Sequence, residues 1–471
     1  MVDQSQAEIG MVGLGVMGRN LLLNMADHNF FVAGYDIDAE KVTSLVKESQ
    51  EHNVHATGDI QAFVNSLRKP RAIILLVPAG APVDAAIKDF VPLLQPGDLI
   101  IDAGNSYFKD TDRRAQDLKA KGIHFMGMGV SGGEAGARHG PSMMPGGPKE
   151  AYERLRPLLE AVAAKVKGEP CVTYIGLGSA GHFVKMVHNG IEYGIMQLIS
   201  ETYALMKLGL RLTNQQLHEV YSLWNQGELS SYLLEITSHI FSKLDDKTGK
   251  SLIDMITPVA AQKGTGMWTS QIAMELQVPV PTIDIAVAMR DLSGFVSERQ
   301  QASVLYPSPT FQLTSDATLL IQQLQQALFA SLLIVYAQGM ALLKVASDKY
   351  QYQLHLEDIA RIWRGGCIIR AALLEDIRSA FQAHADLPNL LLDANLAEQL
   401  KSHENGLRQV VGLATKAGIA IPGLTQSLSY LDSYRSAWLP ANLIQAQRDY
   451  FGSHTYRRLD RDGIFHTEWD S

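Results

Sequence analysis

The chain has 471 residues, of which 46% are hydrophobic and 19% charged, and its formal net charge at pH 7 is -8. This composition is typical of a globular protein with more than one domain, and an acidic chain without a long basic run argues against nucleic acid or an anionic membrane as the main partner. Its two cysteines, Cys171 and Cys367, provide neither a disulfide framework nor a CxxC or CxxH metal spacing, so we expect a reduced, cytoplasmic setting and no metal.

The chain begins without the basic and apolar regions of a secretory signal. Its first predicted elements are a strand, a turn, a helix and a second strand over residues 8–36. The turn carries Gly13, Gly15 and Gly18 in the pattern GxGxxG, and Asp36 stands at the end of the second strand. Such glycines permit a tight turn, close approach to a pyrophosphate and packing of helix on strand. The pattern predicts a dinucleotide site; a purely structural glycine turn is the alternative.

Further strand-like runs at residues 71–77, 98–105 and 124–133 alternate with helical patterns. This alternation predicts a doubly wound α/β domain of the Rossmann type over residues 1–178. Ligands of such sheets bind beyond the carboxyl ends of the strands, where Asn105 and the loop Ser131-Gly132-Gly133 are expected. The same residue types also form ordinary turns, so these two loops have a second interpretation that involves no ligand.

The stretch GHFVKMVHNGIEYG, residues 181–194, is predicted to be a helix with a polar stripe. Five side chains at i, i+3, i+4, i+7 and i+8 share one face: Lys185, His188, Asn189, Glu192 and Tyr193. Gly181, Gly190 and Gly194 each destabilise a helix by about 1 kcal/mol relative to alanine, which is easier to understand if a ligand or another backbone approaches there. A solvated helix face is the alternative interpretation.

From about residue 179 the pattern changes to long helical segments that contain an internal similarity. Three pairs of segments correspond in the same order, with offsets of 137 to 141 residues: residues 201–207 with 338–344, the segments beginning at 224 and 363, and residues 277–282 with 418–423. The similarity predicts an all-α unit over residues 179–436 that arose by duplication, with chance similarity of short apolar helices as the alternative. The longest apolar run, residues 327–337, is too short to span a bilayer.

The C-terminal segment, residues 437–471, begins with a helical pattern and continues as a polar tail. It carries five aromatic residues: Tyr450, Phe451, Tyr456, Phe465 and Trp469. This is more aromatic surface than a free chain end usually has, so we expect the tail to dock on its own chain or on a partner.

Motifs along nearly the whole chain resemble those of decarboxylating 6-phosphogluconate dehydrogenases. In chain order they are GLGVMG, GNS, VSGGEAGARHGPSMMPGG, GHFVKMVHNGIEYG, QKGTGMWT and QAQRDYFGSHTY. The resemblance implies a Rossmann domain followed by a large all-helical domain, in a homodimer whose C-terminal tail completes the partner's site. It also implies oxidative decarboxylation of 6-phosphogluconate to ribulose 5-phosphate, a step of the pentose phosphate pathway, with NAD or NADP and without a metal.

The resemblance also assigns roles to residues. Lys185 matches the base that takes the C3 hydroxyl proton, and Glu192 matches the acid that protonates C1 after CO2 has left. About 10 Å of helix separates them, too far for an i, i+4 ion pair. The substrate residues that it implies are Asn105, Ser131, Gly132, Gly133, His188, Asn189, Tyr193, Lys263, Thr265 and Arg290, with Arg448 and His454 from the neighbouring tail. Together with the glycine motif and the end of the second strand, the predicted cofactor residues are Gly13, Leu14, Gly15, Val16, Met17, Gly18, Asp36, Val77, Ala79 and Asn105.

The end of the second strand departs from the family pattern. Members that use NADP typically carry Asn-Arg followed by Ser or Thr there, whereas this chain has Tyr35-Asp36-Ile37-Asp38, and Pro78 stands where a lysine is typical. Asp36 is able to accept hydrogen bonds from both ribose hydroxyls of NAD and repels a 2'-phosphate. We therefore predict a preference for NAD, with NADP as the family default and the open alternative.

Two other functions compete with this assignment. Another β-hydroxyacid dehydrogenase would share the Rossmann start and the lysine helix, and a catalytically silent dinucleotide sensor would share the first domain. The duplicated helical part and the phosphate residues argue against the first. The presence of both Lys185 and Glu192 argues against the second.

Overall fold

The computed structural model describes residues 6–49, 53–307 and 316–470. Its N-terminal part is a seven-stranded sheet in the order β3-β2-β1-β4-β5-β6-β7, parallel except for β7, which runs antiparallel to β6. The strands are β1 (Ile9–Val12), β2 (Val32–Tyr35), β3 (Val54–Thr57), β4 (Ala72–Leu75), β5 (Leu99–Asp102), β6 (His124–Ser131) and β7 (Ser142–Gly146). The strands expected from the sequence are confirmed, and β3 and β7 are additional. The strand order reverses between β1 and β4, where dinucleotides bind in such sheets.

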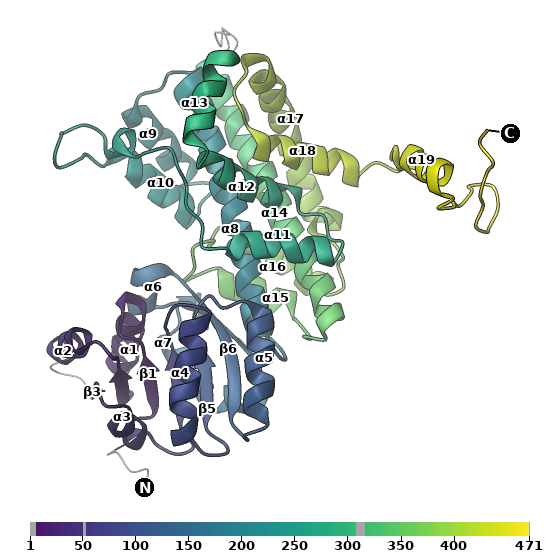
Figure 1. The fold of residues 1–471 in the computed structure, drawn as a ribbon. Coiled ribbons are helices and arrows are strands. Elements are labelled where there is room, and N and C mark those ends of the chain that lie inside the picture. Colours follow the sequence, from purple (N-terminus) through teal and green to yellow (C-terminus); the bar gives the residue numbers. More distant parts are fainter. Residues whose placement is uncertain (1–5, 50–52, 308–315, 471) are drawn as a thin grey trace.

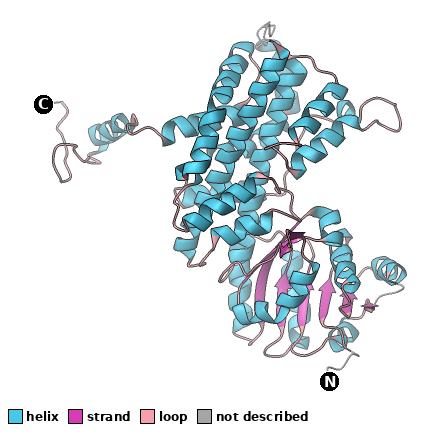
Figure 2. Cartoon of the chain, turned by 180° about the vertical axis from the view of Figure 1, so that it is seen from behind, coloured by secondary structure: helices cyan, strands magenta, loops and turns pink. Residues whose placement is uncertain are grey.

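Helices cover both faces of this sheet (Figure 2). They are α1 (Val16–Asp27), α2 (Ala39–Glu48), α3 (Ile60–Ser66), α4 (Ala81–Phe90), η1 (Val91–Leu93), α5 (Phe108–Lys119), α6 (Gly133–His139) and α7 (Lys149–Val162), followed by the small hairpin β8 (Lys165–Val166) and β9 (Glu169–Pro170). Successive strand residues alternate between two cores: Ile74 belongs to the core with α1 and α7, and Ile73 to the core with α3 and α4. The sheet is therefore buried on both faces, as a parallel sheet requires.

The rest of the chain is helical and stacks above the carboxyl edge of the sheet (Figure 1). Its elements are α8 (Ala180–Ala204), the π-helical turn η2 (Leu205–Gly209), α9 (Asn214–Trp224), α10 (Tyr232–Ser242), η3 (Leu252–Met255), α11 (Thr265–Glu275), α12 (Pro281–Ser293), α13 (Val296–Leu305), α14 (Ala317–Tyr350), α15 (Leu356–Trp363), α16 (Leu373–Ala383), η4 (Leu390–Leu392), α17 (Ala394–Ala417), α18 (Pro422–Tyr434) and α19 (Ala441–Gly452). Helices α8 and α14 contribute to one large hydrophobic core. The fold class is thus an α/β Rossmann-type part followed by a large all-α part.

The internal similarity of the sequence corresponds to contacts between equivalent residues. Helix α8 packs on α14, and α12 packs on α18. Ser231 and Ala371, 140 residues apart, form an antiparallel β-bridge. Such a bridge between equivalent positions is what a local two-fold axis produces, so the two helical repeats face each other as a pseudo-symmetric pair.

Two buried side chains extend this symmetry to the helix ends. Glu201 accepts hydrogen bonds from the backbone N–H groups of Gly423 (2.7 Å) and Leu424 (2.8 Å) at the start of α18. Gln338, 137 residues further along, accepts one from the N–H of Thr282 (3.1 Å) at the start of α12. Each repeat therefore satisfies the free N–H groups of a helix in the other repeat.

Helix α14 is longer than the apolar run of residues 327–337, whose length alone predicts that no segment can span a bilayer. By length and composition it is long and apolar enough to cross a membrane, and 83% of its most apolar window is buried inside the protein. The sequence estimate was wrong because the helix continues well beyond the apolar run. Its burial identifies it as the central helix of the all-α core.

Helix α19 and the residues after it stand apart from the helical body (Figures 1 and 2). This segment folds on itself around the carboxylate of Asp449, which accepts hydrogen bonds from the backbone N–H groups of Thr455 (2.8 Å) and Thr467 (3.1 Å) and from the Trp469 indole (2.9 Å). Leucine, isoleucine and aromatic side chains remain exposed on it: Leu443, Ile444, Tyr450, Phe451, Leu459 and Ile464. The tail is thus structured, with apolar surface uncovered.

Candidate active site

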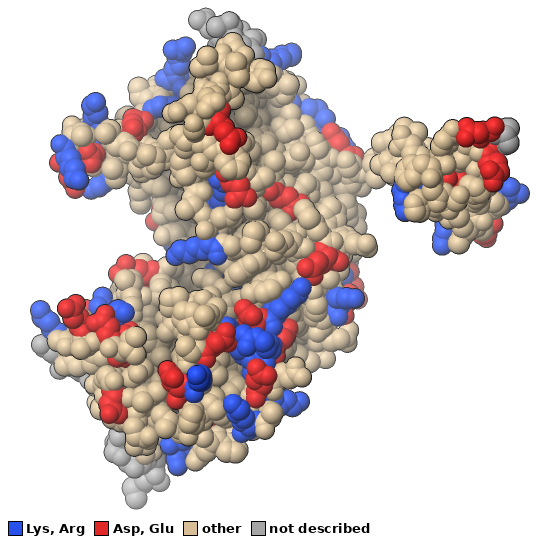
Figure 3. Space-filling view, in the orientation of Figure 1, with Lys and Arg blue, Asp and Glu red and all other residues tan. Residues whose placement is uncertain are grey.

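A cavity of about 460 Å³ lies where α8 meets the loops beyond β5 and β6. Figure 3 shows the molecule hollowed between the α/β part and the helical part. The cavity is lined by Met17, Asn105, Val130, Ser131, Gly132, Gly133, Lys185, Asn189, Glu192, Tyr193, Ala261, Gln262, Lys263, Thr265, Arg290 and Ile368. Eleven of these sixteen residues are substrate or catalytic residues predicted from the sequence.

Four of the five side chains in the polar stripe of α8 line this cavity, and the fifth, His188, is fully buried and is not among the lining residues. Lys185 is 6% exposed and His188 is fully buried, so the interpretation of a solvated face is wrong. The glycine at the start of the stretch explains how the helix comes so close to the sheet. A Cβ at Gly181 would lie 2.2 Å from the Met144 carbonyl oxygen and 2.3 Å from that of Gly127. Another backbone, and not a ligand, therefore requires the absence of a side chain there.

Lys185 belongs to a buried hydrogen-bond network that centres on His188. The Ile368 backbone N–H donates to Ser131 Oγ (3.4 Å), which lies 3.3 Å from His188 Nε2. On the other side of the ring, His188 Nδ1 lies 3.1 Å from Asn189 Oδ1 and 3.4 Å from Lys185 Nζ. A proton on Nδ1 satisfies these contacts, because Ser131 then donates to Nε2.

Burial is the main influence on the three titratable groups of the stripe. It lowers the pKa of His188 well below its ordinary value, so the ring is neutral and its 4.0 Å approach to Glu192 is not an ion pair. It also lowers the pKa of Lys185, with Glu192 opposing the shift, and raises the pKa of Glu192, with Lys185 opposing. Both shifts are toward the neutral amine and the protonated carboxyl, which are the forms a general base and a general acid need.

The two loops at the edge of the sheet complete this side of the cavity. Asn105 Oδ1 accepts a hydrogen bond from Asn189 Nδ2 at 3.4 Å. Gly132 has φ of 115°, and a Cβ there would lie 2.5 Å from the Gly366 carbonyl oxygen. The turn between α15 and α16 therefore supports the Ser131 loop from behind, and Ile368 of that turn lines the cavity. No sequence motif pointed to Ile368, because its side chain has no group that reacts or forms hydrogen bonds.

The opposite end of the cavity is basic. Lys263 and Arg290 line it with Tyr193 and Thr265, and the Arg290 guanidinium carbon lies 3.4 Å from the centre of the Tyr193 ring. Within the described ranges, neither cation has a carboxylate partner within 4.0 Å. Two cations without carboxylate partners beside two hydroxyl groups suit a phosphate dianion.

Arg448 and His454 lie outside this cavity in the same chain. Both belong to the tail, where Arg448 donates a hydrogen bond to Gln445 (3.0 Å) and the His454 ring contacts Phe451. The structure therefore does not bring them to the substrate residues of their own chain.

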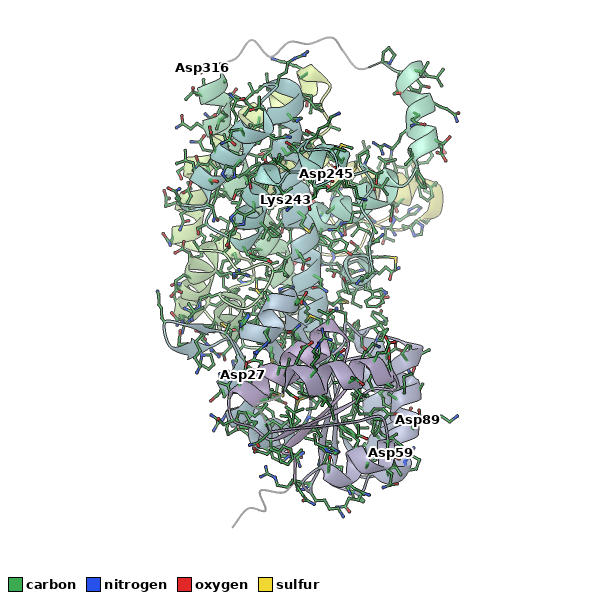
Figure 4. All side chains as sticks on the ribbon, turned by 90° about the vertical axis from the view of Figure 1, so that its left-hand side faces the viewer. Asp27, Asp59, Asp89, Lys243, Asp245 and Asp316 are labelled. Carbon is green, nitrogen blue, oxygen red and sulfur yellow. The ribbon has the colours of Figure 1, made fainter. Side chains whose placement is uncertain are left out.

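A second cavity, of about 520 Å³, lies at the carboxyl ends of β1, β2 and β4. It is lined by Val12, Gly13, Gly15, Tyr35, Asp36, Ile37, Lys41, Ile60, Leu76, Val77, Pro78, Pro82, Ala85, Ala86, Asp89 and Phe90, and Asp89 is labelled in Figure 4. Nothing lies within 4 Å of a Cβ built at Gly15, so the start of α1 is open to an anion. The cavity suits a dinucleotide at the point where the strand order reverses.

Asp36, one of the residues that line this second cavity, is held in place by hydrogen bonds. Its carboxylate accepts hydrogen bonds from the backbone N–H groups of Leu14 (2.7 Å) and Asp38 (2.9 Å). Lys41 Nζ lies 3.7 Å from Asp36 and 3.6 Å from Asp38. Sequence reasoning missed Lys41, whose place in the first turn of α2 gives it access to the same carboxylates.

The remaining cofactor residues predicted from the sequence are distributed around the two cavities. Met17 and Asn105 line the substrate-side cavity, Gly18 packs on the backbone of Gly13, and Val16 is half exposed at the start of α1. Ala79 lies in the loop between β4 and α4, next to the lining residue Pro78. Among the residues that the structure describes, no group of three or more His, Cys, Asp or Glu side chains is arranged to hold a metal ion.

Comparisons with known proteins agree with this geometry. Residues 8–176 match the family described as the NAD binding domain of 6-phosphogluconate dehydrogenase, and residues 181–469 match the C-terminal domain of 6-phosphogluconate dehydrogenase. The chain is 52% identical over 466 residues to an NADP(+)-dependent, decarboxylating 6-phosphogluconate dehydrogenase of Bacillus subtilis, with 99% of both chains covered. It is 48% identical over 466 residues to the decarboxylating 6-phosphogluconate dehydrogenase of Escherichia coli, again with 99% of each covered.

A solved structure is also similar over nearly the full length of the chain. The 6-phosphogluconate dehydrogenase of Plasmodium falciparum, described in its apo form and in complexes with its cofactor NADP+ and its substrate 6-phosphogluconate, superposes with a TM-score of 0.95. The two chains are 45% identical, and the match covers 98% of this chain and 100% of the other.

Proposed function

The chain belongs to the 6-phosphogluconate dehydrogenase family, and we propose that it converts 6-phosphogluconate to ribulose 5-phosphate and CO2 while reducing NAD(P)+. The observation that carries the proposal is the convergence of Lys185, Glu192 and the basic Lys263–Arg290 end on one cavity. A neutral base, a protonated acid and a phosphate site in one cavity are what this reaction requires.

Lys185 acts first as the base. Its amine, whose pKa is lowered by burial, takes the proton of the C3 hydroxyl. The nicotinamide ring of the bound cofactor supplies the acceptor for the hydride that leaves C3. The proton therefore stays on Lys185, and the sugar acid is now a 3-keto acid.

Lys185 then acts in its protonated form. The C1–C2 bond breaks, CO2 leaves, and the electron pair moves toward the C3 oxygen, to which the Lys185 ammonium donates a hydrogen bond. Glu192 gives its proton to C1 of the resulting enediolate, which was C2 of the substrate, and the adjacent C–O⁻ group becomes the carbonyl of the 2-keto sugar. The proton that Lys185 took from the C3 hydroxyl balances the one that Glu192 gives. Stabilisation of the developing negative charge is thus assigned to Lys185, a residue of the chain itself.

The remaining cavity residues hold the substrate in this proposal. Among the lining residues, Ser131, Gly132, Gly133, Asn105 and Asn189 bind the carboxylate and hydroxyl groups, whereas His188 is fully buried next to them. Tyr193, Lys263, Thr265 and Arg290 bind the phosphate. The neutral His188 ring, fixed by Ser131 and Asn189, orients the C1 to C3 end without adding a charge beside Lys185.

A homodimer is part of the proposal. Arg448 and His454 lie on a structured tail that stands away from its own cavity, and the apolar side chains exposed on the tail need a covering surface. We assign Arg448 and His454 to the phosphate site of the second copy. A cytoplasmic location is also proposed, because the described helix that is apolar enough for a membrane is a buried core helix.

NAD is the cofactor we propose to be preferred. Asp36 is held by two backbone N–H groups in the second cavity, where a carboxylate accepts hydrogen bonds from ribose hydroxyls and repels a 2'-phosphate. Lys41 is the nearby cation, and it is shared between Asp36 and Asp38. The name of the Bacillus subtilis relative specifies NADP(+), so the comparison of the two cofactors is a direct test of this assignment.

The testing experiment measures initial rates of cofactor reduction with 6-phosphogluconate, in separate titrations of NAD and NADP, together with the CO2 and ribulose 5-phosphate formed. Equal amounts of reduced cofactor and CO2 support the reaction, and a higher kcat/KM with NAD supports the cofactor assignment. Absence of turnover with either cofactor would overturn the proposed function. Turnover of unphosphorylated hydroxy acids instead would point to another β-hydroxyacid dehydrogenase.

A further inference from the structure

Arg114, on α5, is a buried cation that contacts neither cavity. Its side chain is 2% exposed. The guanidinium donates to four acceptors: Asp84 Oδ1 from Nε (2.8 Å), the Gly80 carbonyl from Nη2 (3.0 Å), and Asp102 Oδ2 (3.2 Å) and Ser106 Oγ (3.4 Å) from Nη1. Burying a guanidinium without such partners is strongly destabilising, so its four acceptors indicate a defined structural task.

The four acceptors belong to two loops that flank the cofactor and substrate residues. Gly80 ends the loop after β4, directly after Ala79, and Asp84 lies in the first turn of α4. Asp102 ends β5, and Ser106 directly follows Asn105. One planar guanidinium therefore connects the β4–α4 loop to the β5–α5 loop.

Asp102 fixes the second loop from the inside. Its carboxylate, fully buried, accepts hydrogen bonds from the Gly104 N–H (3.0 Å) and from the Ser106 hydroxyl (2.6 Å). These two donors stand on either side of Asn105, which points to Asn189 on α8. The position of Asn105 in the substrate cavity is thus determined by Asp102, and the position of Asp102 is tied by Arg114 to the loop that carries Ala79.

We propose that Arg114, acting through Asp102, is a positioning residue that sets the cofactor loop and the Asn105 loop relative to each other, and so the approach of substrate C3 to the nicotinamide. The inference rests on the proposed function. Its physical basis is geometric, because a guanidinium offers a rigid planar set of donors that a lysine ammonium cannot reproduce. Misplacement of reacting groups by about 1 Å costs on the order of 100-fold in rate.

The test compares R114K with R113K in the full-length chain. Arg113 is the adjacent residue of α5, half exposed, and it also binds Asp84, but it contacts neither Asp102 nor the Asn105 loop. The readout is kcat per functional site, where functional sites are counted by stoichiometric titration with reduced cofactor. Partial unfolding would lower the number of sites and leave kcat per site unchanged, which separates positioning from stability.

The expected result for R114K is a fall of about 10- to 100-fold in kcat per site, with a change in cofactor Kd of less than about threefold because the adenosine half is held elsewhere. R113K is expected to stay within about twofold of the unaltered chain. A kcat per site for R114K equal to that of R113K would overturn the inference.

A second variant covers the case in which R114K does not fold. S106A removes one hydroxyl from the same network and leaves the Arg114–Asp102 pair in place. A fall of about threefold or more in its kcat per site supports the inference, and an unchanged value overturns it. Absence of turnover by the unaltered chain would overturn the proposed function, and this inference with it, whereas normal turnover by R114K overturns the inference alone.

Discussion

Lys185 and Glu192 stand two helical turns apart on α8, and their side chains line the same cavity. Burial moves their pKa values toward each other, down for the amine and up for the carboxyl. Each side chain is the second influence on the other, and that influence favours the charged forms. The shift of both groups toward their uncharged forms is therefore a property of burial.

The first prediction concerns the pH dependence of kcat/KM. A base must be neutral, so the rate falls as the pH drops through the pKa of Lys185; an acid must be protonated, so the rate falls as the pH rises through the pKa of Glu192. We expect a bell-shaped profile. E192Q should lose about 10²- to 10⁴-fold in rate together with the basic limb of the profile. A basic limb that persists unchanged in E192Q would assign that limb to another group.

The second prediction concerns the tail. K185A and R448A homodimers should each be nearly inactive. If Arg448 of the partner subunit completes the site, a mixed dimer contains one site with an intact lysine and an intact tail. Denaturing and refolding the two variants together should then restore about a quarter of the normal activity, since half the dimers are mixed and half their sites are intact. Mixing K185A with E192Q, both on α8, is the matched control.

The control pair and the test pair give different results only if the tail acts between subunits. In the control, Lys185 and Glu192 are needed in the same cavity, and every site of a mixed dimer has one of them altered. Activity should stay absent there. Equal recovery in both mixtures, or recovery in neither, would place Arg448 outside the partner's site.

The third prediction concerns cofactor choice. Replacing Asp36 by Asn and Ile37 by Arg removes a charge that repels a 2'-phosphate and adds a cation that pairs with it. The ratio of kcat/KM with NADP to that with NAD should rise by about tenfold or more. The KM for 6-phosphogluconate at saturating cofactor is the control and should stay unchanged. A ratio that does not rise would show that Asp36 does not decide the preference.

The fourth prediction concerns Glu201, whose pKa is raised by burial to about 7. Between about pH 4.5 and pH 7 the folded state therefore binds more protons than the unfolded state, so the free energy of unfolding falls as the pH rises through this window. The shift corresponds to about 3 kcal/mol. In E201Q this pH-dependent fall in the free energy of unfolding should be absent. Urea unfolding at about pH 5 and pH 8 would measure it.

Gln338 offers a matched comparison for Glu201. Q338E places a second carboxyl at the equivalent helix start, beside the Thr282 N–H. It should add a pH dependence of the same sign, with stability again lower at the higher pH. If E201Q retains the full pH dependence of the unaltered chain, another group is responsible for it.

The start of the Rossmann part could be predicted from the sequence, because few residues can replace the glycines of GxGxxG in a tight turn or the carboxylate of Asp36 at the end of a strand. It missed β7, where Pro145 removes a backbone donor and is tolerated because β7 is an edge strand. It also missed Ile368 and Arg114. Both are ordinary residue types, and Arg114 is one of 41 Lys and Arg residues. Only the folded arrangement, which brings α5 to the ends of β4 and β5, distinguishes it from the others.

The reciprocal capping of α18 by Glu201 and of α12 by Gln338 bears on how such a chain could have evolved. A polypeptide with a single copy of the helical module would leave its helix start and the face of its long helix unsatisfied. A second copy of the polypeptide, in an isologous dimer, would have to accept the hydrogen bonds of the helix start and cover the face of the long helix. Joining two copies in one gene replaces that encounter by a tethered one with an effective concentration on the order of millimolar. On this account the contact between α8 and α14 began as an interface between two subunits, and its formation no longer depends on the protein concentration.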